Sequence, residues 1–288
     1  MTKLNIKNIS AFKDGDDING FFFCRLAHCK VTRLGDEFVD LILEDNSGSI
    51  RGKVWSYVDI FKSKFSKGIA VAIKGKIISY NNKLEINVLS INKANEELYK
   101  IYGFDQNQLI KRIKENENKL YEELFDFINK LSPNYKKIIS NIVKDNQIKI
   151  KSIPSIDKGY ILKGGFIKQV ISILRLNKKI LPLYKKLNND VIISGIIIKN
   201  IGLVNYFNDD IECSVSEENE ILDSRLLGIN IINDCCSKYS NFPQQIKTNL
   251  QNIILSENLY QENQINYINS LYQFDLSINL YSSDDEIL

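Results

Sequence analysis

Residues 38–55, FVDLILEDNSGSIRGKVW, contain two alternating runs that are separated by a short polar segment. Apolar residues or glycine occupy every second position from Val39 to Leu43 and again from Ile50 to Val54. Because side chains alternate between the two faces of a β-strand, this period of two predicts strands with one buried face. The Asn-Ser-Gly segment between the runs has a typical turn composition, so the whole stretch predicts a β-hairpin.

Strands of the same kind flank this hairpin. GFFFCRLAHCKVTR, residues 20–33, is rich in aromatic and apolar residues. IAVAIKGKIISY and KLEINVLSIN, residues 69–80 and 83–92, are joined by two asparagines that suit a tight turn. Residues 19–95 therefore predict five short strands with hairpin turns, which favours a small closed barrel and above all the OB-fold.

From about residue 105 the hydrophobic period changes to that of α-helices. Ser132 and Pro133 suit the N-cap and the first position of a new helix. The apolar residues that recur at helical spacing before this point are Leu109, Ile110, Ile113, Leu120, Leu124, Phe125, Ile128 and Leu131. Further helical patterns run through about residues 164–187, 190–200, 222–240, 243–256 and 260–272.

The sequence thus predicts an α+β protein of two domains, an N-terminal OB-fold β-barrel followed by an all-α domain. The expected segments are an N-terminal extension (1–18), the barrel (19–95), basic connecting helices (96–158), a helical domain (159–275) and an acidic tail (276–288).

The composition is that of a globular protein, with 44% hydrophobic and 25% charged residues. No apolar stretch reaches the roughly 18–20 residues that span a bilayer, and the N-terminus lacks the apolar segment of a secretory signal. We therefore expect a cytoplasmic protein without a membrane partner. The five cysteines include no CxxC pair, which favours reduced thiols over a disulfide or a zinc site.

The net charge of +3 conceals an asymmetry along the chain. Residues 19–95 carry 12 Lys and Arg against 7 Asp and Glu, and residues 96–190 carry 19 against 11. Residues 191–288 carry 4 against 14. A polyanion such as nucleic acid would be attracted to the first two-thirds and repelled by the last third, unless these charges form ordinary solvated faces.

Alternation also places four side chains of the hairpin on one outer face of the barrel. If the apolar positions point inward, then Phe38, Arg51, Lys53 and Trp55 point outward together. Aromatic rings stack on unpaired bases and cations neutralise phosphates, which is how OB-folds hold single strands. Alternatively, Trp55 packs against the helical domain, Phe38 covers the mouth of the barrel, and the two cations are ordinary exposed side chains.

The order of these elements resembles the YhaM-type 3′–5′ exoribonucleases, which join an OB-fold to an HD-superfamily phosphohydrolase domain. The resemblance is best in residues 38–55 and continues through GGFIKQVISI, SGIIIKNIGLV, RLLGINII and LQNIILSENL, in that order. It covers roughly residues 19–272. The resemblance implies that the helical domain is of the HD type and that the ligand of the barrel is RNA.

In that family, His and Asp side chains of the helical domain bind divalent metal, and the resemblance implies where those ligands would stand in this chain. The positions are Gln169, Lys199, Asn200, Ile229, Glu257, Asn258 and Asn269. Only Glu257 has a carboxylate, and a lysine at the position of the His-Asp pair would place a positive charge where a dication belongs. The resemblance therefore implies a degenerate metal site, with no catalytic residue, no metal and no cofactor.

His28 is the one histidine of the chain, and it falls in the first strand of the predicted barrel. We interpret it as an ordinary strand residue. An acidic segment between predicted helices is either a solvated loop or an alternative Mg²⁺ site; its carboxylates are Asp209, Asp210, Glu212, Glu217, Glu218 and Glu220. The sequence contains no P-loop and no GxSxG or HExxH motif.

Three hypotheses follow. In the leading one, the chain is a non-catalytic pseudoenzyme that binds single-stranded RNA or DNA through the barrel, while the helical domain self-associates or docks an active nuclease. In the second, the chain is an interaction or structural subunit without nucleic-acid binding, and Phe38 and Trp55 anchor a protein interface. In the third, Glu257 and other carboxylates retain a metal-dependent exoribonuclease activity.

Overall fold

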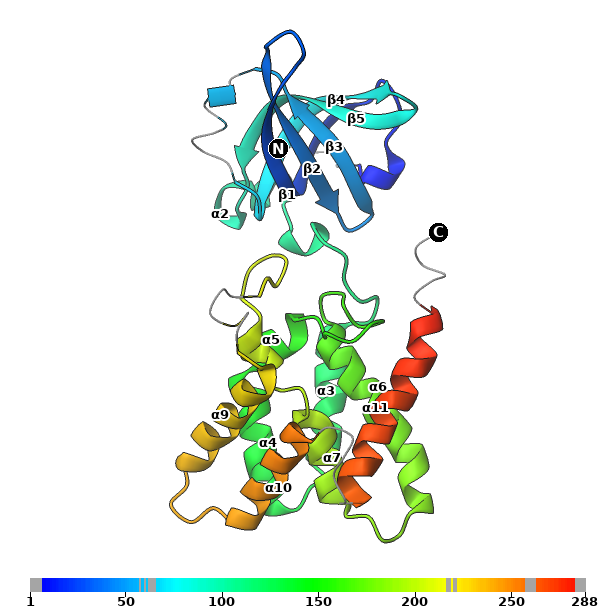
Figure 1. The fold of residues 1–288 in the computed structure, drawn as a ribbon, viewed down its shortest axis with the longest axis vertical. Coiled ribbons are helices and arrows are strands. Elements are labelled where there is room, and N and C mark those ends of the chain that lie inside the picture. The colour runs from blue at the N-terminus through cyan, green and yellow to red at the C-terminus, as the bar shows by residue number, and fades with distance from the viewer. Residues whose placement is uncertain are drawn as a thin grey trace. The chain divides into compact units, whose positions relative to one another are not determined.

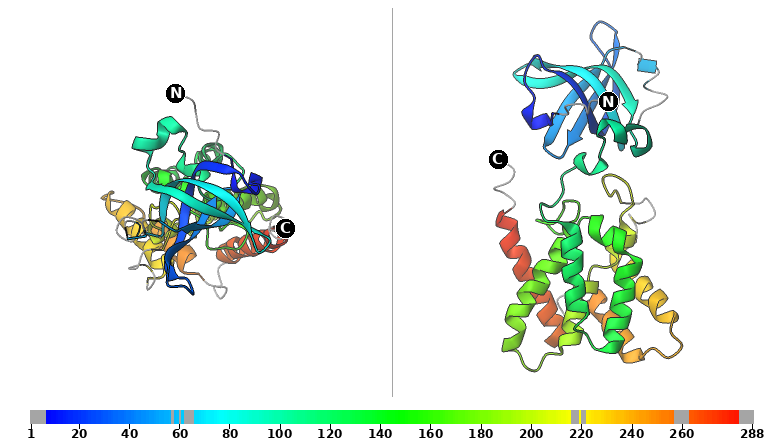
Figure 2. Two further views of the ribbon diagram at one scale, coloured as in Figure 1. Left: turned by 90° about the horizontal axis from the view of Figure 1, so that it is seen from above. Right: turned by 180° about the vertical axis from the view of Figure 1, so that it is seen from behind.

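The computed structural model describes residues 7–56, 58–59, 61, 66–215, 219, 222–256 and 263–282. Of these, residues 280–282 are described as backbone only. The chain divides into two compact units, residues 1–112 and residues 113–288, which Figures 1 and 2 show as a barrel and a group of helices. The segment 96–158, expected to connect the domains, is shared between them: residues 96–112 belong to the barrel unit and residues 113–158 to the helical unit.

The barrel unit is a closed barrel with the strand order β1-β2-β3-β5-β4. Neighbouring strands are antiparallel except for β3 and β5, whose parallel pairing closes the barrel. The five predicted strands are confirmed as β1 (Asp17–Val31), β2 (Glu37–Asp45), β3 (Gly48–Val54), β4 (Ile69–Tyr80) and β5 (Lys83–Lys93). Short helical turns lie before and after the strands: η1 (Ile9–Ala11), α2 (Glu96–Tyr99), η2 (Lys100–Tyr102) and η3 (Gln106–Gln108).

The alternation of residues 38–55 produces the barrel core. Val39, Leu41 and Leu43 are fully buried and pack with Ile50 and Val54. A side chain at position 52 would meet the Leu43 methyl group at 2.9 Å, so the glycine there leaves room for the large core residues of β2. The period of two therefore gives the correct inward face of both strands.

A buried carboxylate fixes the turn between β2 and β3. Asp45 accepts hydrogen bonds from the backbone N–H of Ser47 and Gly48 at 2.7 and 3.0 Å and from the Ser47 hydroxyl at 2.6 Å. It also accepts from the backbone N–H of Ile9 at 2.8 Å, which ties the N-terminal segment to this turn. The predicted Asn-Ser-Gly turn is thus stabilised by an aspartate that the alternation pattern alone leaves without a role.

The helical unit is built around one apolar helix, α7 (Asn189–Ile198), whose residues 191–198 are all buried. Helix α7 contacts α4, α6, α10 and α11. The axes of α3 and α4 lie side by side, and the two helices run in opposite directions (Figures 1 and 2). A helix that is apolar on every side is typical of such a central position. The other elements are α3 (Glu117–Ile128), α4 (Pro133–Asp145), α5 (Gln147–Ser152), α6 (Gly165–Ile180), η4 (Leu181–Leu183), α8 (Leu203–Tyr206), α9 (Ser224–Ser237), α10 (Gln244–Leu255) and α11 (Asn263–Ser282).

Three helix boundaries differ clearly from the predicted ones: the start of α3, the end of α6 at Ile180 rather than near residue 187, and the end of α11. Leu109 and Ile113 are buried but lie in irregular segments, and α3 begins only at Glu117, where the Asn116 side chain accepts hydrogen bonds from two backbone N–H groups. Helix α11 continues to Ser282, past the predicted end near residue 272. Apolar spacing reports which residues are buried, whereas the capping asparagine decides where the backbone becomes helical. The predicted start of α4 at Pro133, with Ser132 as N-cap, is confirmed.

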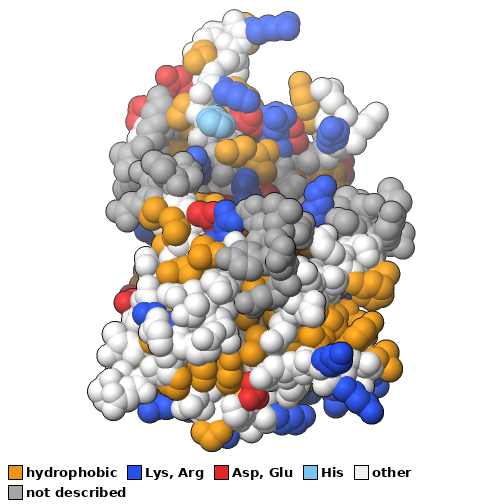
Figure 3. All heavy atoms as spheres, turned by 60° about the horizontal axis from the view of Figure 1, so that its bottom comes forward, with side chains coloured by type: hydrophobic (Ala, Val, Ile, Leu, Met, Phe, Trp, Pro, Cys, Tyr) orange, Lys and Arg blue, Asp and Glu red, His pale blue; other side chains and the backbone are white. Residues whose placement is uncertain are grey.

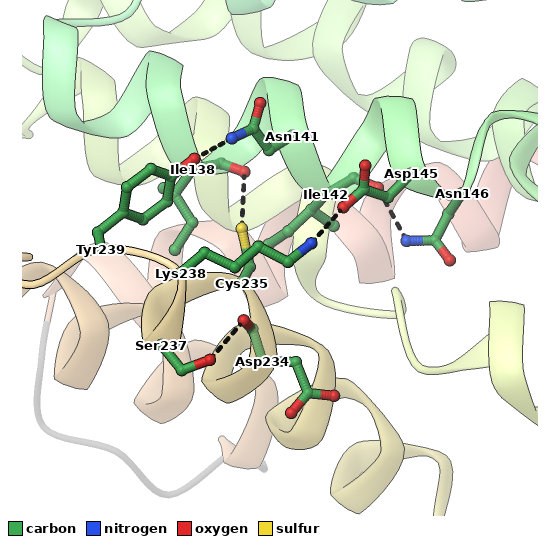
Figure 4. Close-up of polar contacts among 10 residues, drawn as sticks. All are labelled: Ile138, Asn141, Ile142, Asp145, Asn146, Asp234, Cys235, Ser237, Lys238 and Tyr239. Atoms are coloured by element: carbon green, nitrogen blue, oxygen red, sulfur yellow. Dashed lines mark hydrogen bonds and ion pairs between the residues drawn. The ribbon is translucent and has the colours of Figure 1, made fainter.

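Polar contacts align α9 with α4 (Figure 4). Lys238, just after α9, forms an ion pair with Asp145 at 2.9 Å, and the Asn141 amide donates to the Tyr239 hydroxyl. The Cys235 thiol donates to the Ile138 carbonyl at 3.8 Å, and burial raises the pKa of this thiol to about 11. Within the described part of the chain, no helix combines the length and apolarity needed to cross a bilayer.

Candidate nucleic-acid interface

Strands β2 and β3 bring the four predicted residues onto one outer face of the barrel. Asp40 lies opposite Lys53, and Ile42 lies opposite Arg51, so their side chains share the face turned away from the core. Phe38 and Trp55 stand at the same end of this face, at the start of β2 and just after β3. The alternation thus correctly predicts that the four side chains are neighbours.

Phe38 and Trp55 stack on each other, with ring centroids 4.7 Å apart and an interplanar angle of 26°. Phe38 is half-buried, while Trp55 remains 46% exposed. The pair is therefore a platform with one open indole face, and a base would stack onto that face rather than insert between the rings.

The cations of this face are paired with carboxylates. Asp40, only 9% exposed, lies between two of them: its Oδ2 is 2.5 Å from Lys30 Nζ and its Oδ1 is 3.1 Å from Arg51 Nε. Lys53 Nζ is 2.7 Å from Glu85 Oε2, and Glu85 is 6% exposed. The pattern of residues 38–55 does not reveal the pairs of Lys30 and Glu85, because these two residues reach the face from β1 and β5.

Tyr80 extends the aromatic surface beyond the stacked pair. Its ring lies 4.7 Å from Lys53 Nζ, in cation–π geometry, and the residue is 56% exposed at the end of β4. Sequence reasoning missed Tyr80, although its position beside the Asn-Asn turn marks it as a residue of the barrel rim.

Two loops border this face. In the β1–β2 loop the Thr32 hydroxyl accepts from the backbone N–H groups of Leu34 and Asp36, and Leu34 stands 91% exposed at the tip. Asn81 and Asn82 connect β4 to β5 with φ of +50° and +61°, as a two-residue turn of type I′ requires. The loops at these two positions flank the ligand in OB-folds.

The electrostatic field of the face is weaker than its cations suggest. Lys30, Arg51 and Lys53 face Asp40 and Glu85, which leaves an excess of one positive charge among these five groups. A phosphate would have to compete with a carboxylate for each cation. Stacking on Trp55 and Tyr80 is therefore the main interaction that this surface offers.

In the helical unit, three of the positions implied by the resemblance lie in buried polar contacts. The Gln169 side chain is fully buried; its Oε1 accepts from the Ser155 hydroxyl and its Nε2 donates to Asp157, both at 2.7 Å. Lys199 Nζ donates to Asn269 Oδ1 at 2.6 Å. Burial lowers the pKa of Lys199, and the Asp157 charge acts in the opposite direction.

Two further positions, Asn200 and Ile229, lie in the described part of the helical unit. Asn200 and Ile229 are half-buried, and Ile229 packs against the hydrophobic core. Glu257 and Asn258 lie outside the described residues, as do Glu217, Glu218 and Glu220 of the acidic segment. Asp210, in the same segment, accepts from the backbone N–H of Ser214 at 2.8 Å. Among the residues that the structure describes, no group of three or more His, Cys, Asp and Glu side chains is arranged to hold a metal ion.

The single histidine and the cysteines form no joint site in the described residues. His28 is exposed on β1 opposite Asp40. All five cysteines are free thiols, and burial raises the pKa of Cys24 to about 11, which makes it a poor nucleophile at neutral pH.

Comparison with protein families identifies the barrel. Residues 25–94 match the family model described as OB-fold nucleic acid binding domain. The barrel is an OB-fold. The match runs from the middle of β1 to the end of β5 and stops before the helical unit begins.

Solved structures with some likeness include two chains of replication protein A and a single-stranded DNA binding protein. A domain of replication protein A from Methanococcus maripaludis is 24% identical, with a TM-score of 0.27, over 32% of this chain and 98% of that domain. The single-stranded DNA binding protein of Thermus aquaticus is 16% identical over 28% of this chain and 40% of its own, with a TM-score of 0.26. A chain of a replication protein A heterotrimer bound to single-stranded DNA is 16% identical over 34% of this chain and 80% of its own, with a TM-score of 0.25.

Proposed function

We propose that this chain is a non-catalytic protein that binds single-stranded nucleic acid through the β2–β3 face of its OB-fold, with RNA preferred over DNA. The observation that carries the proposal is the stacked pair of Phe38 and Trp55, which offers an open indole face between the two loops of the barrel rim. The family match of residues 25–94 supports the same function. The preference for RNA rests on the resemblance to YhaM-type exoribonucleases.

The test uses the chain's own fluorophore. Trp55 is the only tryptophan, so quenching of its fluorescence reports on this face alone. Titration with a 16-nucleotide single-stranded RNA should quench Trp55 and raise the anisotropy of a label on the RNA over the same concentration range. The Trp55→Ala variant should bind about 5- to 150-fold more weakly, since each stacked base contributes about 1–3 kcal/mol.

Matched variants make the result specific. Trp55→Phe keeps a stacking ring and should lose less affinity than Trp55→Ala, while Ile148→Ala removes an exposed apolar side chain from the helical unit and should leave RNA binding unchanged. RNA binding that is equally strong in wild type and Trp55→Ala, or absent at low salt, would refute the proposal.

The absence of catalysis is a second part of the proposal and rests on the residues at the implied metal positions. Lys199 brings an ammonium group to Asn269, and the Gln169 amide is bonded to Ser155 and Asp157. Neither arrangement leaves a ligand set for a dication. RNA incubated with the protein and Mn²⁺ or Mg²⁺ should keep its length; shortening from the 3′ end that a chelator abolishes would contradict this part and favour a working YhaM-type enzyme.

A specific surface favours protein association as a companion function. A groove of about 860 Å³ runs between the end of α6, η4 and α11, and Leu183, Tyr184 and Phe274 are exposed along it. Figure 3 shows hydrophobic side chains next to Lys and Arg on the face of the helical unit turned toward the viewer. We propose a second copy of this chain as the occupant rather than an active nuclease. Light scattering should then give a dimer mass that Leu183→Glu converts to a monomer.

A further inference from the structure

The OB-fold carries a second hollow on another part of its surface, away from Trp55. A cavity of about 590 Å³ lies over β1, β4 and β5, and residues of α2 and η2 form one of its walls. This volume is in the range of small-molecule sites. Nothing in the proposed single-strand interface on β2 and β3 uses this cavity.

The strand register explains why the surface is hollow there. Asn19, Lys74 and Ser90 form one row across β1, β4 and β5, and the next row on the same face contains Phe21, Ala72 and Asn92. Side chains in such rows stand about 5 Å apart. Ala72 is at the centre of its row, and its single methyl group leaves the space that larger neighbours on both sides enclose.

Aromatic residues form the wall of the cavity. The ring of Tyr99 packs edge-on against Phe21 at 5.6 Å and lies 6.2 Å from Tyr102. Phe21 is in turn held by Phe104 at 5.1 Å. Tyr102 remains 39% exposed. The wall is therefore fixed by ring contacts, and it can receive a flat aromatic ligand without rearranging.

The polar groups of the cavity are unengaged. Among the described residues, its lining contains one cation, Lys74, and no carboxylate. Within the part of the chain that the structure describes, the side chains of Lys74, Asn19 and Asn92 make no hydrogen bond or ion pair. The cations of the β2–β3 face, by contrast, all have carboxylate partners.

We propose that this cavity binds a single nucleotide, with the base on Ala72 against the tyrosine wall and the phosphate at Lys74. Each amide side chain has both a donor and an acceptor, as the edge of a base requires. Asn19 and Asn92 stand on opposite sides of β4 and one row apart, which places them about 12 Å from each other. An unpaired ammonium group favours an anionic ligand. The nucleotide is either free or part of a strand.

Calorimetric titration of the full chain with 5′-AMP, adenosine and inorganic phosphate tests the proposal. We expect 5′-AMP to bind more tightly than adenosine, and Ala72→Leu, which fills the hollow from the outer face, to weaken 5′-AMP by about tenfold or more. Lys74→Met should bring 5′-AMP down to the affinity of adenosine. Asn92→Ala should weaken the binding of both 5′-AMP and adenosine. This second variant tests the site even if Ala72→Leu disturbs the folding of the barrel.

The controls separate this site from the single-strand interface. Trp55→Ala should leave 5′-AMP binding unchanged within about twofold even if it abolishes RNA binding. If Ala72→Leu also weakens the 16-nucleotide RNA, the pocket takes a nucleotide of the bound strand; if it does not, the pocket takes a free nucleotide. The proposal is overturned if 5′-AMP fails to bind at millimolar concentrations, if Ala72→Leu and Asn92→Ala leave its affinity unchanged, or if Trp55→Ala abolishes it.

Discussion

The β2–β3 face of the barrel and the interior of the helical unit contain buried carboxylates with different kinds of partner. In the barrel, Asp40 and Glu85 lie just beneath the surface and their partners are the charged groups of Lys30, Arg51 and Lys53. In the helical unit, Asp275 is also buried, but its partners are hydroxyl groups inside the fold. The cations of the first arrangement can leave their carboxylates and pair with the phosphates of a ligand. The hydroxyl groups of the second arrangement have no such alternative partner.

The energetic consequence differs accordingly. An ion pair whose cation is half exposed contributes between about 0 and 1 kcal/mol to stability, because water solvates the separated charges well. A hydroxyl donor that loses its acceptor in the interior costs about 1–3 kcal/mol. Changes at Asp40 should therefore act on ligand binding, and changes at Asp275 on folding.

The largest effect should follow from Asp275→Ala. The carboxylate accepts from the Tyr160 hydroxyl at 2.7 Å and from the Ser172 hydroxyl at 2.5 Å. The substitution leaves the buried Tyr160 hydroxyl and the half-buried Ser172 hydroxyl without this acceptor. Burial is the main cause that raises the pKa of Tyr160, and it persists in the variant, so this hydroxyl stays protonated at neutral pH and cannot relieve the loss by ionising. We expect the free energy of unfolding in urea to fall by about 3 kcal/mol.

Asp275→Asn is the matched control, since an amide oxygen still accepts one of the two hydrogen bonds. Its loss of stability should be about half as large, and RNA affinity measured on the folded fraction should be unchanged for both variants. A loss below about 1 kcal/mol for Asp275→Ala would mean that water reaches these groups and that the two units do not differ in the way described.

A smaller effect, and one of opposite sign, is expected from Asp40→Asn. Removal of this carboxylate frees Lys30 and Arg51 for phosphates. RNA affinity at low salt should rise about three- to tenfold, and the slope of log K against log salt should steepen by up to about 1.4, or about 0.7 for each cation that meets a phosphate. Stability should change by less than about 1 kcal/mol.

Asp145→Asn provides the control for Asp40→Asn. It makes the same change in net charge by removing the carboxylate that pairs with Lys238 in the helical unit (Figure 4). An equal increase in affinity in both variants would assign the effect to net charge rather than to the β2–β3 face. An unchanged slope in Asp40→Asn would show that Lys30 and Arg51 do not contact phosphate.

The sequence predicts the fold well because strand and helix periods are local properties. The run from Val39 to Leu43 needs only its own alternation to reveal an inward face, and the asparagines at 81 and 82 need only their tolerance of positive φ to reveal a turn. The late start of α3 could also be predicted from the sequence, since Asn116 is a good N-cap. However, the buried residues Leu109 and Ile113 happen to stand at helical spacing, although they lie in irregular segments.

The candidate sites were less predictable because their partners come from distant segments. The grouping of Phe38, Arg51, Lys53 and Trp55 follows from one hairpin, whereas the pairing of Lys53 with Glu85 depends on the parallel contact of β3 with β5. The hollow over Ala72 requires the register of three strands. In the same way, the hydrogen bond from Lys199 to Asn269 joins two residues that are 70 positions apart along the chain.

The smallest effect concerns Lys199, which contrasts with the barrel cations because its partner is the neutral Asn269 amide. Burial lowers the pKa of Lys199 below its ordinary 10.5, so the native state binds fewer protons than the unfolded state between the lowered pKa and 10.5. Stability contributed by this group therefore rises with pH across that window, by at most about 1.4 kcal/mol per pH unit. Lys199→Met should remove this rise, so that urea unfolding between pH 8 and about 10 shows a shallower increase in stability than wild type.

Lys185→Met, at an exposed lysine, should reproduce the wild-type pH dependence. If Lys199→Met also follows the wild-type curve, the ammonium group is as well solvated as those of the barrel, and the contrast between the two units would rest on Asp275 alone.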